Sequence, residues 1–132
     1  MLLLTLLLAA EAHYSSPYDA IGKAFDRCVD AAAESPDFDA DYAQCSKAEL
    51  KARDAALSRR YAIVMKRSSP AQRERLRASE RLWIQERDQN CQAEANAFRA
   101  EANALKPGAW DHMFRTCLTR YTWKRTEWLE TQ

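Results

Sequence analysis

Apolar side chains recur every three or four positions through most of the chain, which is the spacing of one face of an α-helix. The pattern is interrupted three times, at Ser35-Pro36, at Ser68-Ser69-Pro70 and at Lys106-Pro107-Gly108. Proline and glycine end helices because proline lacks a backbone N–H group and glycine readily adopts turn conformations. No run of residues alternates apolar and polar side chains over the length of a strand. The sequence therefore predicts an all-α protein, a small bundle of four helices.

Capping residues predict where the first two helices begin and end. Ser16-Pro17 pairs a capping hydroxyl with proline at the first helical position, and therefore predicts the first start. The second helix is expected to begin near Asp39 or Asp41 and to run to about Arg67. Its apolar stripe contains Asp54, and a charged residue is unusual at a core position.

The third and fourth helices follow the two later interruptions. Ser69 and Gln72 form a capping box, and the third helix is expected to reach Leu105 unless it bends. Tryptophans at helical spacing are expected to pack in the interior rather than to stack on sugars. Trp123 is expected to be the most exposed tryptophan, because it lies off the main stripe of its helix. The motif residues expected to pack in the core are Leu57, Tyr61, Trp83 and Leu129.

The N-terminus carries a short apolar run, LLLTLLLAA at residues 2–10. This run cannot span a membrane, which needs about 20 residues, but it matches the hydrophobic region of a signal peptide. Ala10-Glu11-Ala12 fits the rule of small residues before a cleavage site. We therefore expect residues 1–12 to be a cleaved signal peptide, although no basic segment precedes the leucines, and residues 13–132 to be one domain. Such a protein would be periplasmic or secreted.

The four cysteines are Cys28, Cys45, Cys91 and Cys117. They form no C-x-x-C pair, and His13 and His112 complete no metal-ligand pattern, so neither a metal site nor a cofactor is expected. An even number of cysteines in an exported chain indicates disulfides. Four cysteines allow three pairings, and sequence alone does not choose among them. The simplest pairing joins sequence neighbours on adjacent helices, Cys28 with Cys45 and Cys91 with Cys117.

Charge is balanced over the whole chain but unevenly distributed along it. Lysine and arginine number 20 against 19 aspartates and glutamates, and this balance disfavours a nucleic-acid-binding protein. Residues 53–81 contain nine basic and three acidic residues. Residues 28–46 contain no lysine or arginine and five acidic residues, which are Asp30, Glu34, Asp37, Asp39 and Asp41. Uneven fields of this kind steer charged partners.

Three motifs follow one another along the chain. They are Cys45-x3-Glu49-x4-Asp54-x2-Leu57-x3-Tyr61, then Trp83-x3-Arg87-x3-Cys91, then Cys117-x4-Thr122-x2-Arg125-x3-Leu129. With Cys28 upstream, their order resembles the LprI-type lysozyme inhibitor domain family over about residues 18–130. The resemblance implies a small, exported, disulfide-bonded helical domain of bacterial envelopes, with lysozyme inhibition attributed to part of the family. This chain departs from the pattern at Ser58, where such domains often have asparagine, and at Glu80, where they often have glutamine.

The polar motif residues allow two interpretations. They form either a binding or acid–base site, or a network of ion pairs that fixes the register of the helices. An isolated buried charge is very costly, so any that face inward must be paired. Enzyme activity is not expected, because the motifs contain no histidine and no nucleophile pattern. The residues concerned are Glu49, Asp54, Arg87, Thr122 and Arg125.

The two charged stretches suggest two kinds of partner. Animal-type lysozymes are typically basic, so the acidic stretch could attract their outer surface, and the protein would inhibit by binding and occluding the enzyme. The basic stretch could instead hold a non-inhibitory interaction module against anionic polymers of the envelope. Each stretch could also be an ordinary solvated surface.

Overall fold

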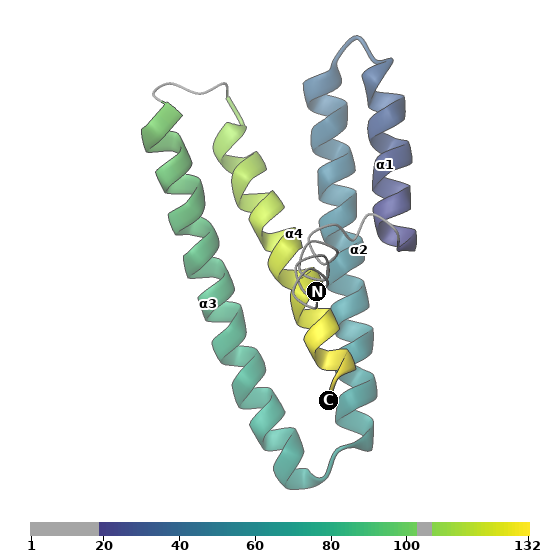
Figure 1. The fold of residues 1–132 in the computed structure, drawn as a ribbon, viewed down its shortest axis with the longest axis vertical. Coiled ribbons are helices and arrows are strands. Elements are labelled where there is room, and N and C mark those ends of the chain that lie inside the picture. The colour runs from purple at the N-terminus through teal and green to yellow at the C-terminus, as the bar shows by residue number, and fades with distance from the viewer. Residues whose placement is uncertain (1–18, 103–106) are drawn as a thin grey trace, which may run out of the picture.

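The computed structural model describes residues 19–102 and 107–132, and these ranges contain four α-helices and no strand (Figure 1). The helices are α1 (Ala20–Ala33), α2 (Phe38–Arg67), α3 (Pro70–Ala102) and α4 (Ala109–Glu130). The prediction of an all-α, four-helix protein is therefore confirmed. The predicted signal peptide lies outside the described residues and stays a prediction.

The α1 helix begins later than predicted, whereas α2 begins at Phe38, next to the predicted Asp39. Asp19 caps α1, because its carboxylate accepts a hydrogen bond of 2.7 Å from the backbone N–H of Gly22. The prediction that this helix starts at Ser16-Pro17, which lies outside the described residues, was therefore wrong. Asp37 caps α2 and accepts from the backbone N–H of Ala40 at 3.2 Å. Aspartate is as good an N-cap as serine, and this is why both helices begin one residue after an aspartate.

The predicted capping box is formed at the α2–α3 junction. The backbone N–H of Ser69 donates to the Gln72 side chain at 2.8 Å, and the backbone N–H of Gln72 donates to the Ser69 hydroxyl at 3.2 Å. The α4 helix is preceded by Gly108, whose φ of 86° lies in the left-handed region that glycine adopts without strain. The predicted third-helix end, Leu105, lies outside the described residues.

The α4 helix lies between α2 and α3, and α1 packs beside the first half of α2 (Figure 1). The α2 and α3 helices diverge from their junction, so α4 provides most of the contact between them. The α1–α2 turn and the start of α4 lie at one end of the molecule, and the α2–α3 junction lies at the other (Figure 1). We call residues 34–42 the tip, and we call the α2–α3 junction with the end of α4 the elbow.

The main apolar cluster lies where α2, α3 and α4 converge towards the elbow. Its buried members are Leu57, Val64, Leu76 and Leu129, and Tyr61, Met65 and Trp83 pack against them. All four motif residues that we expected in the core belong to this cluster. Two disulfides hold the more open half, where Cys28 joins Cys45 between α1 and α2, and Cys91 joins Cys117 between α3 and α4. These are the pairs of sequence neighbours that we expected.

Candidate functional site

The tip presents acidic side chains to solvent. Three of them also serve the start of α2, because Asp37 caps the helix and Asp39 and Asp41 lie in its first turn. Carboxylates at this position are stabilised by the partial positive charge of a helix N-terminus. All five residues of the predicted lysozyme-facing stretch are exposed: Asp30, Glu34, Asp37, Asp39 and Asp41.

An aromatic cluster lies beside these acids. Phe38 is 43% exposed, and its ring centroid is 5.5 Å from that of Tyr42. Tyr42 also contacts His112 of α4, with ring centroids 5.4 Å apart. A groove of about 350 Å³ runs between the starts of α2 and α4 and is lined in part by these three rings. The tip therefore combines negative charge with an accessible apolar anchor.

The pKa of His112 is lowered within this aromatic cluster. Burial lowers the pKa of His112 from its usual 6.5, and the neighbouring Arg115 lowers it further. The folded protein therefore binds fewer protons at this site than the unfolded chain, so its stability should fall as the pH drops below about 6.5. His112→Phe keeps an aromatic ring but cannot take a proton. We expect urea unfolding at pH 7.5 and pH 5.5 to show a smaller loss of stability in this variant than in the unmodified protein. An equal loss in both would contradict this assignment.

Arg125 makes several polar contacts in the interior. It is 9% exposed, and its Nε atom donates to the Glu80 carboxylate at 2.9 Å. Its Nη2 atom donates to the Ser79 hydroxyl at 2.8 Å. The guanidinium lies 3.9 Å from the ring centroid of Trp128 and 5.5 Å from that of Trp83. Glu80, one of the two departures from the family pattern, is thus the ion-pair partner of Arg125.

Arg87 connects three helices through its guanidinium. The Nη1 atom lies 3.9 Å from the carboxylate of Asp54 on α2, and it donates to the hydroxyl of Thr122 on α4 at 3.4 Å. Thr122 is fully buried, whereas the Asp54 side chain is 53% exposed. Partial burial nevertheless raises the pKa of Asp54, and Arg87 opposes that shift. The structure therefore brings Asp54, Arg87 and Thr122 together, as the order of the motifs alone could not show.

Glu49 lies in a different contact, with a residue that the sequence analysis did not single out. Arg53 is 5% exposed and pairs with the carboxylate of Asp19 at the start of α1, and its Nη2 atom lies 3.8 Å from the Glu49 carboxylate. Burial raises the pKa of Glu49; Arg53 opposes the shift, while Asp19 and Asp26 add to it. Arg53, and not Asp54, occupies the buried side of α2, so the placement of Asp54 on the core stripe was wrong. A charged residue four positions before Leu57 was the available signal.

The polar motif residues therefore form two separate groups, Glu49 with Arg53 and the others around Arg87 and Arg125. In the described part of the chain each of these cations meets a carboxylate of a neighbouring helix or turn. No group of three or more potential metal ligands lies close together among residues 19–102 and 107–132. This arrangement favours the interpretation that the network fixes helix register.

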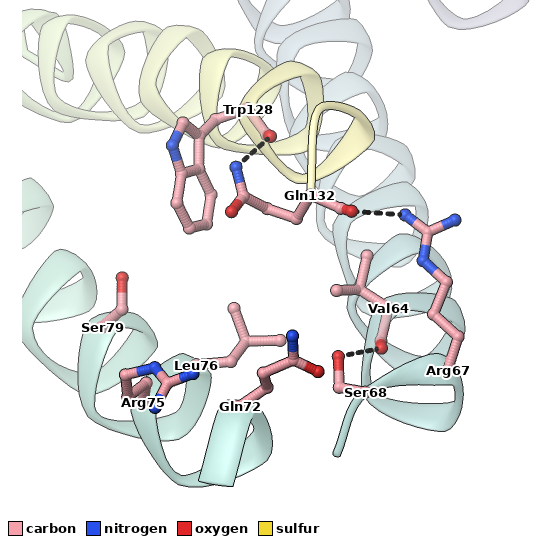
Figure 2. Close-up of a pocket in the computed structure, with 9 residues that line it drawn as sticks. All are labelled: Val64, Arg67, Ser68, Gln72, Arg75, Leu76, Ser79, Trp128 and Gln132. Carbon is pink, nitrogen blue, oxygen red and sulfur yellow. Dashed lines mark hydrogen bonds between the residues drawn. The ribbon is translucent and has the colours of Figure 1, made fainter.

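The elbow holds a pocket with a volume of about 620 Å³ (Figure 2). The end of α2, the start of α3 and the end of α4 form its walls. Trp128 lines it and is 38% exposed, whereas Trp123 is only partly exposed. The expectation that Trp123 is the most exposed tryptophan was therefore wrong, because Trp128 covers the Arg125 guanidinium from the outside.

The features described so far define a small, disulfide-bonded helical protein with a charged, aromatic tip. In the described ranges, the helices are all too short or too polar to cross a membrane. Residues 28–129 match the family described as Lysozyme inhibitor LprI, and the chain belongs to this family. No curated protein and no solved structure matches the chain.

Proposed function

We propose that this protein acts outside the cytoplasm, where it binds lysozyme through the tip and inhibits the enzyme by occluding it. Membership of a lysozyme inhibitor family supports the partner, and two disulfides are typical of proteins outside the cytoplasm. The observation that carries the contact surface is the exposed ring of Phe38 among carboxylates that have no basic residue near them in the sequence. The proposed role is binding, and it requires no catalytic step.

The attraction to a basic enzyme has to be local. The net charge of the chain is +1, so the protein as a whole would not attract a cation. Within about 8 Å, the screening length at physiological salt, a partner near the tip would experience the exposed acidic residues together with Arg115, which lines the same groove. Local charge of this kind raises the rate of association, while a buried aromatic residue supplies most of the binding energy. Phe38 is the residue of the tip suited to that second role.

A disulfide, a hydrogen bond and a ring contact restrain the tip before it meets a partner. The Cys28–Cys45 disulfide joins α1 and α2, the two helices that flank the tip. Within the tip, the Ser35 hydroxyl accepts a hydrogen bond from the backbone N–H of Asp37 at 3.1 Å. Phe25 of α1 contacts Tyr42 edge to face, with ring centroids 6.0 Å apart. A surface ordered in advance loses less conformational entropy on binding. These contacts support the tip as a docking surface.

Charge reversal at the tip tests this proposal. Asp37→Asn keeps a good N-cap and removes a charge, and Asp39→Lys with Asp41→Lys reverses two more. Half-inhibition of lysozyme turnover on cell walls should then require at least about tenfold more of this triple variant than of the unmodified protein. The reason is that a complementary charge has become repulsive. Unchanged inhibition would remove the tip from the mechanism.

A matched control separates the tip from net charge. Glu86→Lys, Glu127→Lys and Glu101→Gln change the net charge by the same amount at exposed positions on α3 and α4. We expect this control to inhibit like the unmodified protein. An equal loss in both triple variants would show that overall charge, and not the tip, determines inhibition.

A second function is favoured by the opposite end of the molecule. The basic stretch 53–81 surrounds the elbow, and most of its arginines and lysines are exposed there, whereas Arg53 is buried. Positive charge concentrated at one end would hold the protein against anionic envelope polymers while leaving the tip free. Retention on an anionic matrix that weakens with salt would support this function.

A further inference from the structure

We propose that the elbow pocket is a binding site for an acidic saccharide, a sugar chain that carries carboxylates. This inference rests on the second function above and names the site and the ligand class. The pocket volume of about 620 Å³ lies within the range of small-molecule sites, which is about 300–1,000 Å³. No aspartate or glutamate lines the pocket.

Two cations lie on opposite sides of this space. Arg67 lies near the end of α2 and Arg75 in the first turns of α3, and Figure 2 shows them on opposite sides of the pocket. One Arg67 nitrogen, Nη2, donates to the main-chain oxygen of Gln132, the last residue of the given sequence, at 3.0 Å, which fixes the side chain at the pocket edge. Arg75 has no hydrogen-bond or ion-pair partner among the residues that the structure describes. Both guanidinium groups therefore retain N–H donors for a ligand.

The neighbouring polar groups add further donors. The Gln72 side-chain oxygen accepts from the backbone of Ser69, so its amide nitrogen is left to donate, and Figure 2 shows that nitrogen directed into the pocket. The Ser79 hydroxyl already accepts from Arg125, so its hydrogen is the group left to offer. Ser68 donates to the backbone carbonyl of Val64. With four donor groups available, the pocket suits a ligand that is anionic and rich in acceptor oxygens.

The apolar part of the lining distinguishes a sugar from a simple anion. Val64, Leu76 and Trp128 line the space between the two arginines (Figure 2). An inorganic anion would contact one arginine and leave this surface unused. A carboxylated saccharide has charges separated by the apolar faces of its rings, which match an apolar wall with a cation at each side. The Trp128 ring of this wall packs on the Arg125 guanidinium, 3.9 Å from the ring centroid, before any ligand binds.

The test is calorimetric titration of the disulfide-bonded protein with a galacturonate trisaccharide. Arg67→Gln with Arg75→Gln should weaken binding at least about tenfold, since hydrogen bonds to charged groups are the strong ones. The matched control is Arg59→Gln with Arg81→Gln, which removes equal charge at exposed positions outside the pocket. We expect this control to change binding less than about threefold, as befits screened surface charges.

Each arm has an outcome that overturns the proposal. An equal loss in the two double variants would leave a general attraction to anionic polymers and remove the pocket from it. Binding of inorganic phosphate as tight as that of the trisaccharide would contradict the sugar class. No binding of the trisaccharide would contradict the pocket site, and salt-sensitive retention on an anionic matrix would still test the broader polymer function. Binding of a neutral galactose trisaccharide equal to that of the acidic one would show that the arginines do not select the ligand.

Discussion

Arg125→Met should lower the free energy of unfolding by about 3 kcal/mol, because it leaves the Glu80 carboxylate without its cation in a site that is largely shielded from water. The Glu80 side chain is 15% exposed and that of Arg125 is 9% exposed. Methionine fills much of the volume of the arginine stem, so the loss reports chiefly the broken ion pair and the hydrogen bond to Ser79. Urea denaturation followed by circular dichroism measures it.

A double variant separates the pair from the packing around it. Arg125→Met with Glu80→Leu removes both charges, and buried ion pairs replaced by apolar side chains often cost little. We expect this variant to recover most of the lost stability. If Arg125→Met alone costs less than about 0.5 kcal/mol, like an ordinary surface substitution, the network does not hold the helices. A stable single variant that no longer inhibits lysozyme would instead support the binding-site interpretation.

Removal of either disulfide should cost about 3 kcal/mol in the chain-entropy account, with the larger loss at the α3–α4 disulfide. Cys91 and Cys117 are fully buried and lie 26 residues apart, whereas Cys28 and Cys45 lie 17 apart and Cys28 is partly exposed. Because both cysteines are buried, replacing Cys91 and Cys117 with alanine also leaves a void in a packed site. Guanidinium denaturation of the two double alanine variants compares them directly.

The two losses should also differ in where the protein opens. Of the larger helix–helix contacts, α1 takes part only in the one with α2. Without Cys28–Cys45, α1 can therefore detach while the rest of the protein stays folded. The α3 helix packs on α4, so without Cys91–Cys117 its second half should exchange amide hydrogens faster. Faster exchange confined to α1 in the Cys91/Cys117 variant would contradict this assignment.

The helices could be predicted because their signals are local. The Ser69–Gln72 capping box needs only four consecutive residues, and the end of α2 at Arg67 follows from the break just after it. The start of α1 could not be predicted in this way. Both Ser16 and Asp19 are good caps, and the ion pair between Asp19 and Arg53, 34 residues away, is a tertiary contact that favours the second.

The polar network shows the same limit. Arg53 and Asp54 are consecutive, so they lie about 100° apart around α2, and the apolar stripe alone did not decide which of them faces the core. What places Arg53 inside is the combination of Asp19, the N-cap of α1, and the Trp123 ring on α4, whose centroid lies 6.0 Å from the guanidinium. The elbow pocket could not be predicted from the sequence either, because it depends on the angle between α2 and α3 and on where α4 ends.

Lysozyme turnover on cell walls tests the proposed function most directly. The disulfide-bonded protein without its predicted leader (residues 13–132) would be compared with the same protein after reduction and alkylation. We predict saturable inhibition by the disulfide-bonded form alone, because the disulfides hold the tip and both halves of the fold. The absence of inhibition of several lysozyme types by a verified folded sample would contradict the proposed function.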